Sequence, residues 1–223
     1  MPDEANRMQQ MTSDFQKMVD EFFRIQCRYS AAMREVQTKL EILDDEFQMR
    51  HKRNPIHHMQ YRLKTIQSMM DKLQRKNYAV SMESAVENLR DIAGIRVICS
   101  YVKDVYTVAE LLTSQDDVKL LETRDYIQHP KENGYRSLHL IIEIPVFLHD
   151  GRIGVPVEVQ LRTIAMDFWA SLEHAMRYKA AGVVPQDVCD ELHQVGSDIA
   201  ALDQRMQTIH DRIEAISPQS SDP

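Results

Sequence analysis

Residues 151–163 read GRIGVPVEVQLRT, and this stretch decides how the rest of the chain is arranged. Successive side chains of a β-strand point to opposite faces, so alternation of apolar and polar residues is typical of a strand with two different faces. One face would carry Val155, Val157, Val159 and Leu161, and the other Glu158, Gln160 and Arg162. The apolar first half of the stretch favours a central strand of a β-sheet.

The polar face of this strand allows two interpretations. If the face meets solvent, three polar residues on it are ordinary. If the strand is central, the face must line a functional site. Glu158, paired across the sheet with Asp91, would then offer oxygen ligands to Mg²⁺, which usually takes one or two protein carboxylates.

The remaining segments follow helical or strand periodicity. Apolar residues three and four apart predict one long helix or two over residues 12–50, and another helix over residues 57–76. Strands are predicted at 94–102, 118–127 and 138–148, and helices at 104–114, 164–180 and 185–216. The tail 217–223 is predicted to be disordered. This order of elements indicates a single α+β or α/β domain with helical flanks.

Composition and charge narrow the class of protein. The 223 residues are 43% hydrophobic and 27% charged, as in a globular protein, and no apolar run is long enough for a membrane span. Three cysteines without metal or redox spacing and an acidic, polar N-terminus favour the cytoplasm over secretion. The net charge of −7 argues against a general affinity for nucleic acid.

The charge is unevenly distributed along the chain. Residues 50–76 hold eight Lys and Arg residues against one acid, Asp71. On the predicted helix 57–76, one face would carry Arg62, Lys64, Ser68, Lys72 and Arg75. Such a face suits a chain of phosphates, and the alternative is the solvated side of an amphipathic helix. Repulsion between the like charges makes the face mildly costly unless an anion is bound there.

The motif DIAGIRV (residues 91–97) is a second candidate. Asp91 stands at the entrance of a predicted strand, and Gly94 allows a ligand or another backbone to approach closely. Arg96 lies on the same strand face as Gly94. Ordinary turn chemistry explains Asp91 equally well, so this motif alone is weak.

The motif KENGYRSLH (residues 131–139) is a third candidate. Asn133-Gly134 predicts a tight hairpin turn, because both central positions of a type I′ turn need positive φ. Tyr135 offers a face on which a base can stack, and Lys131, Arg136 and His139 offer donors to phosphate. The alternative is a surface hairpin with incidental charge.

Four segments occur together in an order known from one protein family: RLKTIQSMMDKLQRK (62–76), DIAGIRV (91–97), RDYIQHPKENGYRSLH (124–139) and VEVQLRTIAMDFWASLEH (157–174). Together they resemble the synthetase domain of the RelA/SpoT family, and within it the single-domain small alarmone synthetases. The resemblance implies a nucleotidyltransferase-like core over residues 55–180 with a mixed, mainly five-stranded sheet. Residues 1–54 would be a helical region with oligomer contacts, and residues 181–216 a C-terminal helical region.

The family's reaction transfers pyrophosphate from ATP to the 3′-hydroxyl of GDP or GTP and releases AMP, which makes the alarmones ppGpp and pppGpp of the stringent response. By this resemblance Asp91 and Glu158 are the catalytic pair that binds Mg²⁺. Glu158 is also implied to lie near the 3′-hydroxyl, as a general base or only as a metal ligand. His149-Asp150 and His210-Asp211 lack the surroundings of the family's hydrolase motif, so synthesis without hydrolysis is expected.

The resemblance also divides the remaining residues between the two nucleotides. It implies that Arg62 and Arg96 sandwich the adenine of ATP between guanidinium planes. The ATP phosphates would contact Lys64, Ser68, Lys72 and Arg75. Tyr135 would stack on guanine, and the other contacts to GDP or GTP would come from Arg124, Lys131, His139, Gln160 and Asp167.

This chain departs from the family pattern at two places. Asp167 stands where the small enzymes have an asparagine that reads the guanine edge; a carboxylate still accepts from guanine N–H groups, with altered strength or pH dependence. In tetrameric relatives, lysines and a phenylalanine line a cleft that binds alarmone, and the matching residues here are Gln37, Glu41 and His58. These replacements argue against activation by alarmone, although a homotetramer is still implied.

Two other functions fit the same residues less well. One is a catalytically silent guanosine-nucleotide sensor, which the presence of both Asp91 and Glu158 disfavours. The other is a single-stranded RNA binder that uses Tyr135 and the basic stretch 50–76. The acidity of the whole chain disfavours the RNA binder.

Overall fold

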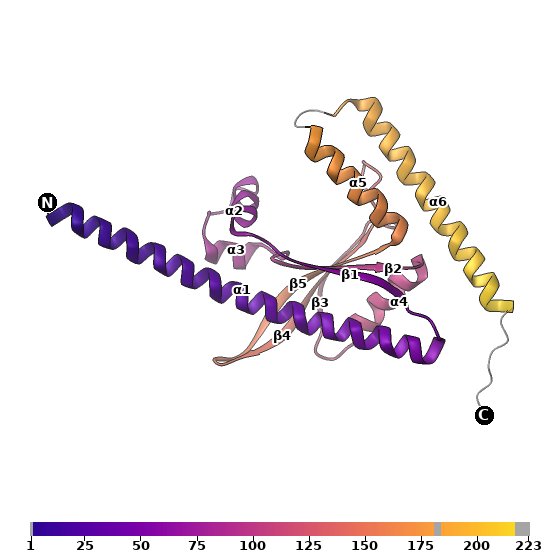
Figure 1. Cartoon of the computed structure of the whole chain (residues 1–223), viewed down its shortest axis with the longest axis horizontal. Helices are drawn as coiled ribbons and strands as arrows, with labels where there is room; N and C mark the ends of the chain where they lie inside the picture. The colour runs from indigo at the N-terminus through magenta and orange to yellow at the C-terminus, as the bar shows by residue number, and fades with distance from the viewer. Residues whose placement is uncertain (1, 181–183, 217–223) are drawn as a thin grey trace.

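The computed structural model describes residues 2–180 and 184–216. Figure 1 shows a twisted sheet with helices on both sides, in the order α1 (Pro2–His51), β1 (Ile56–Leu63), α2 (Ile66–Arg75), α3 (Met82–Asn88), β2 (Ala93–Cys99), α4 (Val102–Thr113), β3 (Lys119–Asp125), β4 (Leu138–Leu148), β5 (Gly151–Thr163), α5 (Ile164–Ala180) and α6 (Gln186–Ile216). The predicted class, a mixed sheet packed by helices and flanked by long helices, is confirmed.

The five strands form one sheet in the order β1-β2-β5-β4-β3, which places β5 in the middle. β2 and β5 run parallel, and the other neighbouring pairs are antiparallel. β4 and β5 are joined by a tight connection and stay in register from Leu138 opposite Leu161 to Leu148 opposite Gly151. The central position predicted for residues 151–163 is therefore confirmed, and both faces of this strand must be covered or used.

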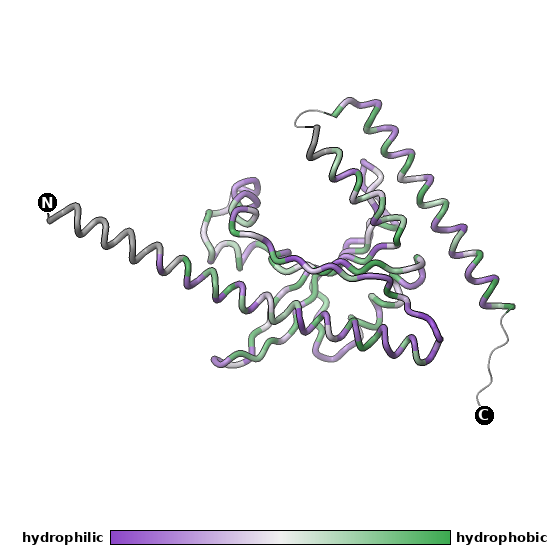
Figure 2. The backbone as a smooth tube through the Cα atoms, in the orientation of Figure 1, coloured by the Kyte–Doolittle hydropathy of each residue, from purple (hydrophilic) through white to green (hydrophobic). Residues whose placement is uncertain are grey.

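One face of the sheet carries the core and is covered by α1 and α4 (Figure 1). Val157, Val159 and Leu161 of β5 are completely buried on this face. From α1, residues three and four apart reach the same core: Ile25, Tyr29, Ala32, Val36, Leu40 and Leu43 (Figure 2). Burying a large aliphatic side chain contributes roughly 1.5–3 kcal/mol, so this stripe holds the long helix firmly on the sheet.

The prediction of one helix over residues 57–76 is wrong. Residues Ile56–Leu63 form strand β1, and Met59, Tyr61 and Leu63 stand opposite residues of β2. Helix α2 begins only at Ile66, where the Thr65 hydroxyl caps it by accepting from the Ser68 backbone N–H at 3.2 Å. Before Thr65 the apolar residues recur at every second position, as in a strand, and after Thr65 they recur three and four positions apart, as in a helix. Taken together, the two sets resemble the apolar stripe of a single helix.

The prediction of a type I′ hairpin turn at Asn133-Gly134 is also wrong. Only Gly134 has a positive φ, of 85°, whereas a type I′ turn would require it at both residues. The turn runs from Lys131 to Gly134, closed by the Gly134 N–H donating to the Lys131 carbonyl at 2.8 Å. It lies within the long connection 126–137 between β3 and β4 and does not join the two strands directly.

The other predicted elements are confirmed within a few residues, and the segment 12–50 is part of one helix, α1. The short helix α3 was not predicted. The tail 217–223, predicted to be disordered, lies outside the described residues. No helix in residues 2–180 or 184–216 combines the length and apolar character needed to cross a membrane.

Candidate functional site

A row of polar side chains crosses the whole sheet on the face opposite the core. Neighbouring strands in register share a face at each paired position. The row therefore passes through all five strands by way of Gln60, Arg96, Gln160, His139 and Arg124. A parallel row one step away contains Arg62, Gly94 and Glu158. The sequence pattern of β5 pointed to this face, and the register extends it to both edges.

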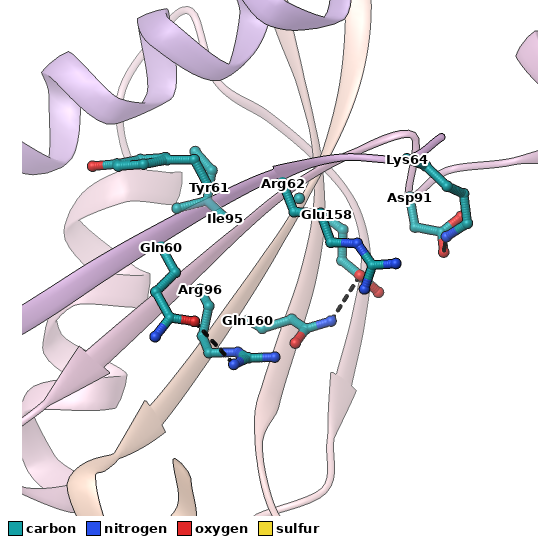
Figure 3. A pocket seen from close by; sticks show the side chains of 10 residues that line it. Gln60, Tyr61, Arg62, Lys64, Asp91, Ile95, Arg96, Glu158 and Gln160 are labelled. Atoms are coloured by element: carbon teal, nitrogen blue, oxygen red, sulfur yellow. Dashed lines mark hydrogen bonds and ion pairs between the residues drawn. The ribbon is translucent and has the colours of Figure 1, made fainter. Parts of the chain in front are cut away.

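The two rows open into a cavity of about 460 Å³ at the β1, β2 and β5 end of the face (Figure 3). Gly94 lies at its floor between Arg62 and Glu158, and its lack of a side chain keeps this floor low. The cavity is lined by Gln60, Tyr61, Arg62, Lys64, Asp91, Gly94, Ile95, Arg96, Glu158 and Gln160. Two carboxylates and three cations thus converge on one nucleotide-sized hollow.

Asp91 is held by two lysines that come from different elements. Its Oδ2 accepts from Lys64 Nζ and from Lys72 Nζ, each at 2.6 Å. Its Oδ1 is buried and has no hydrogen-bond partner among the described residues. Burial raises the pKa of Asp91, but the hydrogen bonds and charges of both lysines outweigh burial and hold this pKa below its usual value. Asp91 is therefore ionised at neutral pH and has one oxygen available to a ligand.

Glu158 lies at the centre of the polar face and is 14% exposed. Its Oε2 accepts from Gln160 Nε2 at 2.8 Å, and its Oε1 lies 3.6 Å from His139 Nδ1. Burial raises the pKa of Glu158, but the contacts with His139 and Gln160 outweigh it and lower the pKa overall. The negative charge of Asp91 opposes this lowering, which shows that the two carboxylates are close enough to interact.

His139 connects Glu158 to Tyr135. Burial lowers the pKa of His139, despite the opposing effect of Glu158, so its imidazole is neutral at neutral pH. Its Nε2 lies 2.8 Å from the Tyr135 hydroxyl. A neutral ring that carries its proton on Nδ1 can donate to Glu158 and accept from Tyr135 at the same time.

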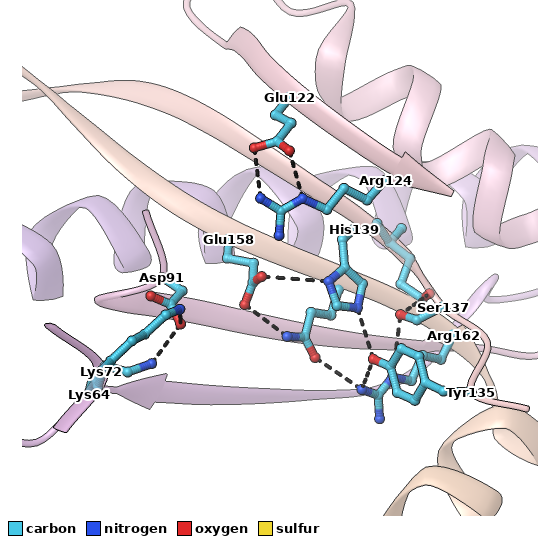
Figure 4. A network of polar contacts seen from close by, with 12 residues as sticks. Lys64, Lys72, Asp91, Glu122, Arg124, Tyr135, Ser137, His139, Glu158 and Arg162 are labelled. Atoms are coloured by element: carbon cyan, nitrogen blue, oxygen red, sulfur yellow. Dashed lines mark hydrogen bonds and ion pairs between the residues drawn. The ribbon is translucent and has the colours of Figure 1, made fainter. Parts of the chain in front are cut away.

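Arg162 is the centre of a second group of polar contacts on this face, separate from the contacts around Asp91 (Figure 4), and is only 4% exposed. It donates to the Tyr135 hydroxyl at 2.5 Å, to Gln160 Oε1 at 3.1 Å and to Asp167 Oδ1 at 3.1 Å. Arg96 Nη1 also approaches Asp167 Oδ1, at 3.4 Å. The alternation of β5 places Arg162 on the polar face, but no role was predicted for this residue. Its position, two residues beyond Gln160 on the same strand face, was the available signal.

The connection 126–137 brings Tyr135 to the edge of this group. The Lys131 ammonium lies 4.5 Å from the ring centre of Tyr126 and 4.7 Å from that of Tyr135. Burial and the nearby Arg124 lower the pKa of Lys131. A cation held over two aromatic rings is attracted by their faces, so Lys131 is positioned beside Tyr135 before any ligand arrives.

Helices α5 and α6 support the same connection from behind. Asn133 Nδ2 donates to Glu173 Oε1 at 3.0 Å, and His193 Nδ1 lies 3.0 Å from the Glu132 carbonyl oxygen. A Cβ atom on Gly196 would lie 2.9 Å from the Gly134 carbonyl oxygen, so only glycine allows α6 to approach this closely. None of these supporting contacts was predicted from the sequence.

The remaining predicted site residues lie at the margin of the face. Ser68 takes part in the α2 cap, and Arg75 is exposed, with its Nε 3.4 Å from the Asp71 carbonyl oxygen. Arg124 pairs with Glu122 through two contacts, of 2.6 and 3.0 Å. Of the predicted ATP-binding residues, Arg62, Lys64 and Arg96 line the cavity and Lys72 reaches Asp91, whereas Ser68 and Arg75 lie outside its described lining.

The site fits a hard divalent cation that needs few protein ligands. Within residues 2–180 and 184–216, no three His, Cys, Asp or Glu side chains gather as a metal-binding group. Asp91 and Glu158 nevertheless line one cavity, and the buried Asp91 Oδ1 has no partner in the described part of the chain. Magnesium typically uses one or two carboxylates and keeps water or substrate phosphates for the remainder, so this donor set suits it.

Comparison with known proteins agrees with the fold and the sequence motifs. A family model described as a region found in RelA / SpoT proteins matches residues 61–183. GTP pyrophosphokinase YwaC of Bacillus subtilis (strain 168) is 42% identical over 186 residues, which is 83% of this chain and 89% of that protein.

Two solved structures of Bacillus subtilis proteins are similar to this chain over most of their length. The structure of small alarmone synthetase 2 has a TM-score of 0.78 and 41% identity, and covers 86% of this chain and 99% of that one. The structure of small alarmone synthetase 1 bound to its product pppGpp has a TM-score of 0.78 and 33% identity, with 86% and 97% covered. The chain therefore belongs to the RelA/SpoT family.

Proposed function

We propose that this protein is a GTP pyrophosphokinase that transfers the β,γ-pyrophosphoryl group of ATP to the 3′-hydroxyl of GDP or GTP, releasing AMP and forming ppGpp or pppGpp. The observation that carries the proposal is the single cavity on which Asp91, Glu158 and the cations Arg62, Lys64 and Arg96 converge. Phosphoryl transfer requires positioning and charge stabilisation above all, and the polar face supplies both.

ATP is assigned to the side of the cavity near α2. The ammonium groups of Lys64 and Lys72 both lie against Asp91 and can turn to phosphate oxygens when ATP enters. Arg62 and Arg96 stand on adjacent strands and both line the cavity, where their planar guanidinium groups suit the faces of adenine. Ser68 and Arg75 lie outside the described lining of the cavity, so they would contact the part of the ATP phosphate chain that extends beyond it.

Magnesium is assigned to Asp91 and Glu158. When held by these two carboxylates, it would supply positive charge that offsets the negative charge developing on the transferred group. Its requirement is testable, because removal of divalent cations by a chelator should abolish synthesis and added Mg²⁺ should restore it.

GDP or GTP is assigned to the side of the face that carries Tyr135. Guanine would stack on the Tyr135 ring, and Asp167 would accept from the guanine N–H groups. Gln160 and His139 lie between this position and Glu158, where they can contact the ribose. Lys131 and Arg124 would contact the acceptor's phosphates, and Arg162 holds Tyr135, Gln160 and Asp167 in place.

The proposed step joins the two sides at Glu158. The 3′-oxygen of the guanosine nucleotide attacks the β-phosphorus of ATP, and the bond between that phosphorus and the α,β-bridging oxygen breaks. AMP leaves with the bridging oxygen, and the proton of the 3′-hydroxyl passes to Glu158. The lowered pKa of Glu158 keeps the carboxylate ionised and able to accept at neutral pH.

The test incubates the purified protein with ATP and Mg²⁺, with or without GDP or GTP, and measures AMP. We expect AMP only when an acceptor is present, in an amount equal to the 3′-pyrophosphorylated product. The matched control is 3′-deoxy-GTP, which retains the base and phosphates but lacks the attacking hydroxyl and should give no AMP. Binding of both nucleotides without AMP release would instead identify a silent sensor.

Assembly as a homotetramer and a cytoplasmic location belong to the same proposal, because they come with the resemblance to small alarmone synthetases. Sedimentation velocity on the full chain measures the assembly directly. A repeat with added pppGpp tests whether Gln37, Glu41 and His58 have removed the alarmone response, in which case neither mass nor activity should change.

A further inference from the structure

Gln60 lines the cavity at the end opposite Asp91 and Lys64 (Figure 3). It stands on the edge strand β1, four positions before Lys64, which is roughly 13 Å along an extended chain. Its Oε1 accepts from Arg96 Nη1 at 3.1 Å, and its Nε2 has no hydrogen-bond partner among the described residues. Gln60 therefore brings one fixed acceptor and one unused donor to this end of the cavity.

The other side-chain amide in the cavity lining already has partners for both of its polar atoms. Gln160 Nε2 donates to Glu158 at 2.8 Å, and Gln160 Oε1 accepts from Arg162 at 3.1 Å. An amide holds a donor and an acceptor side by side, which complements the edge of a nucleobase, whereas phosphate oxygens only accept. Of the two amides, Gln60 is the one that can read a base.

The two ends of the cavity suit different parts of one nucleotide. The Lys64 ammonium, held at Asp91, suits phosphates. With the phosphates at that end and the base between the guanidinium planes of Arg62 and Arg96, the six-membered ring of the purine extends towards Gln60. The edge that reaches Gln60 carries N1 and the group on C6, because these atoms lie across the base from the ribose.

The fixed orientation of the Gln60 amide matches adenine and opposes guanine. In adenine the 6-amino group donates and N1 accepts, so Oε1 and Nε2 of Gln60 find one partner each. In guanine the 6-oxo oxygen accepts and N1–H donates, so each amide atom would face a group of its own kind. Turning the amide over would correct this match, but Nε2 would then point at Arg96 Nη1, which is also a donor. Arg96 thus fixes the polarity with which Gln60 reads the base.

We propose that Gln60 determines the specificity of the donor side: it accepts from the 6-amino group of adenine, donates to N1, and so excludes GTP from the position of ATP. Such a selection is needed because donor and acceptor are both purine nucleotides and meet the same protein in every reaction. This inference rests on the proposed function, since it takes ATP as the pyrophosphoryl donor.

The first test removes the 6-amino group from the donor. Purine riboside 5′-triphosphate, which has hydrogen at this position, is compared with ATP at saturating GDP and Mg²⁺, and kcat/KM is measured from the nucleoside monophosphate released. The native enzyme should prefer ATP by roughly 2- to 12-fold, the effect of one neutral hydrogen bond. In Gln60→Met this ratio should fall to about one, with an unchanged KM for GDP. The control Gln48→Met, exposed on α1 outside the cavity lining, should keep the native ratio.

The second test changes the polarity of the base and of the side chain. ITP carries the 6-oxo group and N1–H of guanine, and its use as donor is measured by release of IMP at saturating GDP. The native enzyme should prefer ATP by roughly 5- to 150-fold, as for an amide that meets the wrong base. In Gln60→Glu both side-chain oxygens accept, so each base has one matched and one opposed contact. The preference for ATP over ITP should therefore fall towards one.

The proposal is overturned if the native enzyme uses purine riboside triphosphate as well as ATP, or if Gln60→Met keeps the native ratio of the two. It is equally overturned if Gln60→Glu keeps the native preference for ATP over ITP. A KM for GDP that rises in Gln60→Met as much as that for ATP would also contradict it, because Gln60 would then support the whole site. All of these results leave AMP release from ATP and GDP by the native protein intact, whereas its absence would refute the proposed function itself.

Discussion

The Asp91 region and the Arg162 region lie on the same face of the sheet but are held together in different ways. At Asp91, two lysine ammonium groups share one carboxylate oxygen while the other oxygen has no partner in the described residues. At Arg162, one buried guanidinium donates to a tyrosine, an amide and a carboxylate. The Asp91 group thus contains a buried oxygen without a hydrogen-bond partner in the described residues, whereas the Arg162 guanidinium has several hydrogen-bond acceptors.

This difference indicates that the two regions respond differently when a ligand binds. Charges that hold each other while one atom lacks a partner must exchange contacts when a ligand binds, so the Asp91 region is expected to rearrange around ATP. A network with satisfied donors is rigid and costs little to organise at the moment of reaction. The Arg162 region is therefore expected to receive GDP or GTP in a form close to that described. Glu158 belongs to both, which makes it the position of greatest sensitivity.

The largest effect is expected for Glu158→Gln. The amide keeps the shape of the side chain but can neither bind Mg²⁺ as a carboxylate does nor accept the hydroxyl proton. Loss of a general base alone costs about 10²- to 10⁴-fold in rate, so we expect kcat for AMP release to fall at least a hundredfold. The control Glu143→Gln changes a carboxylate on β4 outside the cavity lining and should retain native kcat. A Glu158→Gln enzyme with native kcat would refute both roles.

Arg162→Met tests whether the second region is preformed. Removing one member of a buried ion pair costs about 3–5 kcal/mol, and Tyr135, Gln160 and Asp167 lose their common donor. We expect a lower free energy of unfolding in urea and a KM for GDP or GTP raised by more than that for ATP. Arg152→Met, at the exposed end of the same strand, is the control. If the KM for ATP rose as much as that for the acceptor, the division of the face would be wrong.

Lys72→Met tests whether the first region exchanges contacts. A charge-assisted hydrogen bond contributes about 1.5–3 kcal/mol, so kcat/KM for ATP should fall roughly 10- to 100-fold with little change in the KM for GDP or GTP. Lys103→Met, an exposed lysine of α4, is the control. An equal loss for both substrates would show that Lys72 organises the whole site and does not serve ATP alone.

The same variant makes a prediction about pH. Both lysines hold the pKa of Asp91 below its usual value, so Asp91 stays ionised well into acid and synthesis should decline only as the pH falls through this lowered pKa. With Lys72 replaced, the pKa of Asp91 should rise. The acid limb of the profile of kcat/KM for ATP against pH, which reports pKa values of the free enzyme, should then move to higher pH. An acid limb unchanged in Lys72→Met would mean that Asp91 does not control it.

The smallest effect is expected for Tyr135→Phe, which keeps the ring and removes the hydroxyl between His139 and Arg162. We expect a severalfold rise in the KM for GDP or GTP. Tyr135→Ala also removes the stacking surface, which is worth about 1–3 kcal/mol, and should raise this KM about 5- to 150-fold. If Phe and Ala were equivalent, the ring would not be a stacking platform.

The central strand was predictable because its two periodicities, apolar and polar, are local and unmixed. Strand β1 was not, because Met59, Leu63 and Ile66 fit a helical stripe equally well, and only pairing with β2, 30 or more residues away, selects the strand. The same limit applies to the site. Glu158 and Asp91 could be singled out from the sequence, but the importance of Arg162 depends on Tyr135 and Asp167, which come from two other segments, and is visible only in the fold.

We infer that one face of the sheet joins an ATP side to a guanosine-nucleotide side at Glu158. It is tested most directly by following the label of ATP carrying ³²P in its γ-phosphate, in the presence of GTP and Mg²⁺. We predict that the label appears in the outer phosphate of the 3′-diphosphate of the guanosine nucleotide, with one AMP formed for each label transferred, and that Glu158→Gln abolishes both. Label released as free phosphate with formation of ADP, or AMP formed without labelled guanosine product, would contradict the account.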